Sequence, residues 1–168
     1  FLSDGVMPRG FFTDSSRVWN HPEYPLFLPL IESWFYGWLG RSDQGLVKLI
    51  FPPFYLAAVG LLYVGGSRFS GRRLLGWVPA VLLFFVPIAI SLDGSVTSGY
   101  ADFPLAVCYL AAIIYLAEYW ETGAADALRF TGVLGGILPW VNQAGALLLA
   151  TVAVLVAVDG LETDDVHG

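Results

Sequence analysis

The sequence predicts an all-α protein: a multi-pass transmembrane helix bundle with an interfacial helix in its first outer loop. The chain has 168 residues, of which 57% are apolar and 13% charged, whereas about 25% of an average soluble domain is charged. Its mean hydropathy is +0.68. The charged residues are also segregated, which leaves charge-free runs of 15 to 29 residues. Because a helix that spans a bilayer needs roughly 20 mainly apolar residues, these runs predict membrane helices.

The composition excludes several other classes of protein. A chain with this much apolar surface to bury is not intrinsically disordered. The net charge of −6 leaves no basic patch for a nucleic-acid partner. With one cysteine, the protein cannot be a disulfide scaffold, and we interpret Cys108 as a small packing residue within a span.

Residues 1–45 are expected to form the first outer loop. Within it, residues 26–40 are apolar but number only 15, and they include a proline and a glutamate. Trp34 and Trp38 lie one turn apart on the apolar face of a helical wheel. This pattern is typical of a helix that lies in the membrane interface with tryptophan anchors. We retain this interpretation, although a count of Lys and Arg on the two sides mildly favours a span.

Residues 46–158 are expected to hold about five membrane helices. These cover residues 49–67, 74–92, 103–117 with 118–120 at the interface, 125–140 and 144–158. The last two share one charge-free run of 29 residues, which is too long for one level span. Pro139, Asn142 and Gln143 stand in its middle, and a proline removes a backbone donor, so we expect the break there.

Two smaller features complete the expected organisation. Gly132 and Gly136 have the small-xxx-small spacing that lets helix backbones approach closely. Residues 159–168 are expected to form an acidic tail after the last helix.

The loops indicate how the helices are oriented. Arg68, Arg72 and Arg73 lie in one short loop, which the positive-inside rule places in the cytoplasm. Alternation then puts residues 93–102 and the turn at Asn142 outside. We therefore expect a multi-pass protein of the bacterial inner (plasma) membrane with its acidic tail inside.

Three polar clusters fall on the predicted outer side. Their candidate site residues are His21, Glu23, Tyr100, Asp102, Asn142 and Gln143. Polar groups at membrane depth are costly and usually face a cavity or a partner. We therefore expect a site there, built from loops and helix ends. Each cluster also has an ordinary interpretation: a turn at His21, a helix N-cap at Asp102 and a hydrogen-bonded loop residue at Asn142.

Several short motifs follow one another along nearly the whole chain. They are DGVMPR at 4–9, HPEYPL at 21–26, KLIFP at 48–52, TSGYADFPLA at 97–106 and the segment 132–145. In their order and spacing they resemble the membrane glycosyltransferases that use polyprenyl-phosphate sugars, the C-type glycosyltransferase superfamily. This superfamily includes dolichyl-phosphate-mannose protein mannosyltransferases and bacterial lipopolysaccharide sugar transferases.

The resemblance implies transfer of a sugar from a polyprenyl-phosphate donor to a glycan, lipid or protein acceptor at the outer face. The family's usual base, an acidic residue near the end of the first span, would lie before Phe1. Asp102 is then the best carboxylate in hand for positioning the acceptor or a divalent cation, and Tyr100 can line the pocket. No other cofactor and no metal site shared by the two histidines is expected.

The family's basic residue near the later polar turn contacts the lipid phosphate, and this chain departs from that pattern. The turn reads Val-Asn-Gln-Ala at 141–144, with no Lys and no Glu. The amides of Asn142 and Gln143 can donate hydrogen bonds to phosphate oxygens, but they carry no charge. The phosphate contact is therefore expected to be weaker, or to fall to another residue such as His21.

Two functions of other classes stay open. A secondary transporter would also show a helix broken at a polar turn, but it should carry an inverted repeat and ionisable residues within spans, and the sequence shows neither. A non-catalytic membrane scaffold would account for the missing base and the missing lysine.

The orientation can be tested with reporters fused to the loops. A reporter within residues 67–73 is expected to read cytoplasmic, because of the arginine cluster, and one within residues 93–98 is expected to read external. Paired fusions to a periplasm-active phosphatase and to a cytoplasm-fluorescent protein measure this. Both loops on one side would contradict the alternating arrangement.

Overall fold

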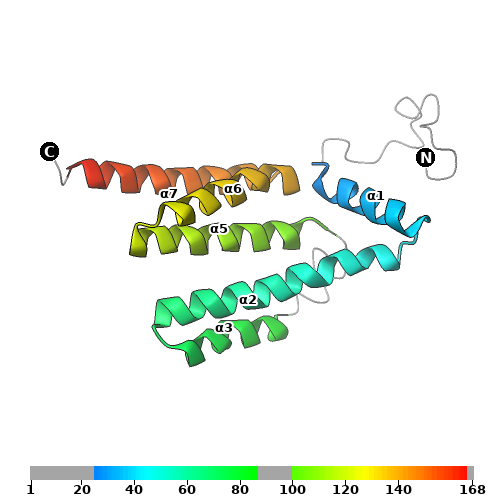
Figure 1. Cartoon of the computed structure of the whole chain (residues 1–168), viewed down its shortest axis with the longest axis horizontal. Coiled ribbons are helices and arrows are strands. Elements are labelled where there is room, and N and C mark those ends of the chain that lie inside the picture. The colour runs from blue at the N-terminus through cyan, green and yellow to red at the C-terminus, as the bar shows by residue number, and fades with distance from the viewer. Residues whose placement is uncertain (1–24, 87–99, 166–168) are drawn as a thin grey trace.

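The computed structural model describes residues 25–86 and 100–165, with side chains up to Asp159. Every regular element in these residues is a helix, as the sequence predicts (Figure 1). The predicted site residues His21 and Glu23 and most of the expected outer loop 93–102 lie outside the described residues.

Helix α1 (Phe27–Leu39) forms almost where the interfacial helix was expected. It ends at Gly40, whose φ of 67° is in the left-handed region that favours glycine. Trp34 and Trp38 are 72% and 75% exposed, whereas Leu28 is buried. The helix therefore presents an aromatic face that the rest of the described chain does not cover.

The helical turn η1 (Leu46–Ile50) leads into α2 (Phe51–Ser70), and together they form a segment of 25 residues that is long and apolar enough to cross a membrane. The carboxylate of Asp43 accepts hydrogen bonds from the backbone N–H groups of Leu46 and Gly45, both at 3.0 Å, ahead of this segment. These bonds, together with the nearby Arg41, hold the pKa of Asp43 below its usual value.

The second expected span, residues 74–92, does not form as one helix. Instead η2 (Arg73–Gly76), α3 (Trp77–Leu82) and η3 (Leu83–Phe85) make a shorter apolar helical segment. It ends because Val86 is extended, with φ −91° and ψ 102°. Val86 precedes Pro87, and a proline disfavours the helical conformation of the residue before it.

Helix α5 (Asp102–Thr122) is the second helix long enough to cross a membrane, and it matches the third expected span. A turn at Gly123 leads into α6 (Ala125–Val141), which is followed by α7 (Gly145–Asp165). The predicted break is confirmed, but it lies at residues 142–144 and α6 continues through Pro139. The last turn of α6 therefore tolerates the loss of the one backbone hydrogen bond that Pro139 cannot donate.

Residues 159–165 of the expected acidic tail continue helix α7, which ends at Asp165. No proline stands in this segment, so each further residue adds one helical hydrogen bond to a helix that has already formed.

The glycines of α6 pack differently from the expectation. A Cβ on Gly132 or Gly136 would meet no atom within 4 Å, whereas one on Gly135 would touch Leu149 and Val152 of α7. Gly135 is therefore the residue that lets α7 approach α6, because only one of these positions faces the partner helix. Gly145 is tighter still, since a Cβ there would collide with the backbone of Leu138.

Successive helices α2, α3, α5, α6 and α7 run in alternate directions (Figure 1). At one end Arg68 of α2 forms ion pairs with Glu118 of α5 at 2.7 Å and with Glu121 at 3.7 Å. This end also holds the turns after α2 and α5. The opposite end holds the start of α5 and the turn between α6 and α7, as the predicted alternation requires.

The contact of α7 with the backbone of α6 predicts a large effect at one glycine. Gly145→Ala is expected to lower the free energy of unfolding by about 1–3 kcal/mol or more, because the methyl group has no space. Gly136→Ala is the matched control, and it should be neutral or stabilising by up to about 1 kcal/mol, since alanine favours helix. Thermal unfolding in detergent measures both. Equal effects of the two substitutions would contradict the close approach.

Candidate functional site

Two of the three predicted polar clusters meet at one end of the bundle. The side-chain amide of Asn142 donates a hydrogen bond from Nδ2 to Oδ1 of Asp102, with 2.9 Å between the two atoms. Asp102 is the first residue of α5, and Asn142 follows the last residue of α6. A carboxylate and an amide 40 positions apart in the sequence are therefore direct partners.

Local backbone structure holds the amide of Asn142 in place. The residue is extended, with φ −155° and ψ 152°. Its Oδ1 accepts a hydrogen bond from the N–H of Ala144 at 3.1 Å, and its backbone carbonyl accepts one from the N–H of Gly145 at 2.9 Å. Because Oδ1 faces a donor, Nδ2 must be the atom that faces the carboxylate. Asn142 thus holds the turn that leads into α7 and also bridges to α5.

Asp102 does not cap its own helix. The N-cap position of α5 is Ala101, and no side chain of the described residues caps this end. The carboxylate of Asp102 is exposed and binds Asn142. Its place in the first turn of α5 is still favourable, because the N-terminus of a helix attracts negative charge. The N-cap interpretation of Asp102 is therefore wrong.

An apolar cluster lies beneath the Asp102–Asn142 pair. Its buried residues are Leu105, Leu138 and Val141. Phe27 and Tyr109 pack against it. Phe27 brings the start of α1 to this end of the bundle, where Figure 1 shows it near the turn between α6 and α7. Phe27 follows directly in the sequence after the motif 21–26, whose His21 and Glu23 lie outside the described residues.

Tyr100 and Gln143 are both exposed and lie next to the pair in sequence, just before Asp102 and just after Asn142. They place a phenol and a second amide at the same end of the bundle. Of the predicted site residues that the structure describes, Asp102 is the one carboxylate. Within the described ranges no group of three or more His, Cys, Asp and Glu side chains could hold a metal ion.

Tyr55 of α2 is a residue that the sequence analysis did not single out. Its ring stacks on Phe103 with 6.1 Å between the ring centroids, and it meets the edge of Phe84 at 5.6 Å. Its hydroxyl is buried, and it has no hydrogen-bond partner in the described part of the chain. Buried polar atoms are normally paired. The signal in the sequence was a tyrosine within a run that is otherwise apolar.

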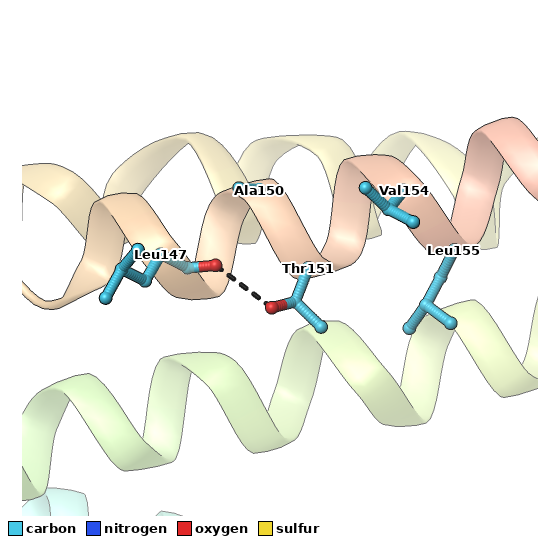
Figure 2. Close-up of a pocket in the computed structure, with 5 residues that line it drawn as sticks. All are labelled: Leu147, Ala150, Thr151, Val154 and Leu155. Carbon is cyan, nitrogen blue, oxygen red and sulfur yellow. Dashed lines mark hydrogen bonds between the residues drawn. The ribbon is translucent and has the colours of Figure 1, made fainter.

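A separate apolar groove of about 430 Å³ lies on α7 (Figure 2). It is lined by Leu147, Ala150, Thr151, Val154 and Leu155. The hydroxyl of Thr151 donates to the carbonyl of Leu147 at 3.0 Å, so it is used within the helix. The groove therefore offers shape and apolar surface, whereas the polar chemistry lies at Asp102 and Asn142.

Comparison of the chain with protein-family models, with curated proteins and with solved structures gives no match.

The Asp102–Asn142 bond predicts energetic coupling between two distant positions. Asp102→Ala and Asn142→Ala should each destabilise the protein, and the double variant should be more stable than the sum of the two losses implies. We expect a coupling energy of about 0.5–1.5 kcal/mol, the usual contribution of one hydrogen bond. Thermal or denaturant unfolding of the four proteins measures it. Strictly additive losses would show that the two side chains act independently.

Proposed function

We propose that this protein is an integral membrane glycosyltransferase that moves a sugar from a polyprenyl-phosphate donor to an acceptor at the outer face of the membrane. The observation that carries the proposal is the bond between Asp102 and Asn142. It brings together two of the motifs, at residues 97–106 and 132–145, on which the resemblance to these enzymes rests.

A membrane location is supported by the low burial of the long apolar helices. The most apolar windows of the segments Leu46–Ser70 and Asp102–Thr122 are only 17% and 39% buried. The core helix of a soluble protein would be mostly buried, because exposed apolar surface of this extent is rare in soluble monomers. Lipid is the environment that removes this surface from water, and we place the protein in the plasma membrane, the inner membrane of a bacterium.

Helix α1 suits the membrane interface. Its exposed tryptophans are amphipathic rings of the kind that gather at the level of the lipid headgroups. Burial also raises the pKa of Glu32 above its usual value. This carboxyl therefore becomes neutral at a higher pH than an ordinary glutamate, which lowers the cost of placing α1 against lipid as the pH falls.

In the proposed reaction, the acceptor hydroxyl attacks the anomeric carbon of the sugar. The bond from this carbon to the acceptor oxygen forms, and the bond to the phosphate oxygen breaks. A base removes the hydroxyl proton, and polyprenyl phosphate leaves as an anion that needs no protein acid. By resemblance, the base is an acidic residue near the end of the family's first span, and no described residue is assigned this role.

The described residues would position the reactants. Asn142 binds Oδ1 of Asp102, so Oδ2 can accept a hydrogen bond from the acceptor hydroxyl. Asn142 has a second N–H on Nδ2, which can donate to a phosphate oxygen. The prenyl chain of the donor would lie along the groove of α7, which begins at Leu147, one turn beyond the polar turn.

A non-catalytic scaffold is the second candidate, and one observation favours it. Asp102 and Asn142 bind each other, which is also what a structural clamp between α5 and the α6–α7 turn would do. A secondary transporter fits less well. Asn142 lies level with the first residue of α5, whereas the broken helices of such transporters meet near the middle of the bundle.

The substitution Asp102→Asn distinguishes the glycosyltransferase proposal from the scaffold proposal. The side-chain oxygen of asparagine can still accept the bond from Asn142, so the intact variant should keep a thermal midpoint near wild type. In the full-length protein, transfer from a polyprenyl-phosphate sugar in isolated membranes should fall at least about 10-fold, which corresponds to about 1.4 kcal/mol of activation free energy.

Asp126→Asn is the matched control for this experiment. Asp126 is an exposed carboxylate in the first turn of α6, at the opposite end of the bundle, and it is bound by Arg129 at 2.8 Å. This variant should transfer sugar at the wild-type rate. Unchanged transfer by the Asp102→Asn protein would assign Asp102 to the clamp and would favour the scaffold.

A further inference from the structure

The turn between α2 and η2 is a rigid element at the end of the bundle that lies opposite the candidate site. Gly71 has a φ of 65°, and its N–H donates to the carbonyl of Arg68 at 3.0 Å. The hydroxyl of Ser70 donates to the carbonyl of Gly66 at 2.6 Å and accepts from the N–H of Arg72 at 3.3 Å. The backbone of the turn is therefore fixed before any ligand arrives.

The packing of α3 against α2 fixes the turn further. A Cβ on Gly66 would collide with the ring of Pro79. One on Gly76 would collide with Ser67 and with the backbone of Tyr63. Helix α2 and the segment η2–α3 therefore pack closely at Gly66 and Gly76, which restricts sliding between them. Residues 71–73 are held at the tip of the resulting tight hairpin.

Arg72 and Arg73 stand in this turn without an acidic partner among the described residues, and both are exposed. The other arginines at this end of the bundle are paired. Arg68 binds Glu118 and Glu121. Arg129 binds Asp126. The acids nearest to the turn on α5 and α6 are thus occupied by other arginines, and the turn carries an uncompensated charge of +2.

Large apolar side chains flank the two arginines. Phe69 is 69% exposed and Leu74 is 83% exposed. An aromatic ring, two guanidinium groups and a leucine therefore follow one another around a single turn. Exposed apolar groups beside unpaired positive charges match the chemistry of an anionic lipid surface, which offers both acyl chains and phosphates.

We propose that this turn binds anionic phospholipids, with Arg72 and Arg73 on the headgroup phosphates and with Phe69 and Leu74 among the acyl chains. The guanidinium group suits this role, because its N–H groups can bind two phosphate oxygens at once. The acidic end of α7 also lies at this end of the bundle, but α7 packs on α5 and α6 and leaves the α2–α3 hairpin uncovered.

The inference rests on the proposed membrane location but not on the proposed reaction. The test uses the purified chain in detergent, to which phosphatidylglycerol or phosphatidylcholine is added, and follows binding by native mass spectrometry and by the thermal midpoint. Wild type should bind phosphatidylglycerol more tightly and be stabilised by it. The preference should weaken as the salt concentration rises.

The variant that tests the turn is the double substitution Arg72→Gln/Arg73→Gln. Each basic residue near an anionic surface contributes about fivefold to affinity, so the double variant should lose roughly 30-fold. Arg72→Lys/Arg73→Lys keeps the charge and should lose less. Arg41→Gln/Arg129→Gln is the control, because it removes the same charge from arginines that are paired with Asp43 and Asp126, and it should bind as wild type does.

Three results would overturn the proposal. The first is equal binding of the two lipids by wild type, and the second is an equal loss of phosphatidylglycerol affinity in the control variant. The third is tight binding of soluble glycerol 3-phosphate, which would leave Phe69 and Leu74 without a role. Sugar transfer by the Arg72→Gln/Arg73→Gln protein in detergent should be unchanged, because the turn is remote from Asp102. Lipid binding by a full-length protein that does not transfer sugar would therefore contradict the glycosyltransferase and leave this inference standing.

Discussion

The hydrogen bond between Asn142 and Asp102 is the interaction on which the candidate site depends. It fixes the turn between α6 and α7 against the start of α5. The same asparagine accepts a hydrogen bond from the N–H of Ala144, in the turn that leads into α7. Three helix ends are thus tied by one planar side chain, and the apolar cluster of Leu105, Leu138 and Val141 closes beneath it. The carboxylate of Asp102 is held exposed at the surface of the bundle.

The charge pattern of the sequence predicts much of this arrangement and misses its finer geometry. Charge-free runs locate α2 and α5, and the polar turn locates the break after α6. The early end of the helix at Phe85 also had a signal, Pro87, but proline is frequent enough in membrane helices that hydropathy outweighs it. Which glycine of α6 faces α7 depends on how α6 is rotated about its own axis relative to α7. The spacing of residues within one helix does not determine that rotation.

The site was predictable in its residue types but not in its contacts. Polar residues in apolar surroundings single out Asp102 and Asn142, yet two different roles for each were compatible with the sequence. The distance between them decides that Asp102 binds another helix and does not cap its own. Tyr55 was missed because a tyrosine in an apolar run is common, and only the tertiary fold shows that its hydroxyl is buried without a partner.

The ion pair of Arg68 with Glu118 has a consequence for the order in which the chain assembles. The α2–α3 hairpin closes through Gly66 and Gly76, and α5, α6 and α7 close among themselves, so each group is built from contacts between neighbours in sequence. Such local contacts form early. Arg68 then joins two groups that are already folded. A charge that is withdrawn from water is costly until it meets its partner, so the docking of the two groups is also the step that neutralises both charges.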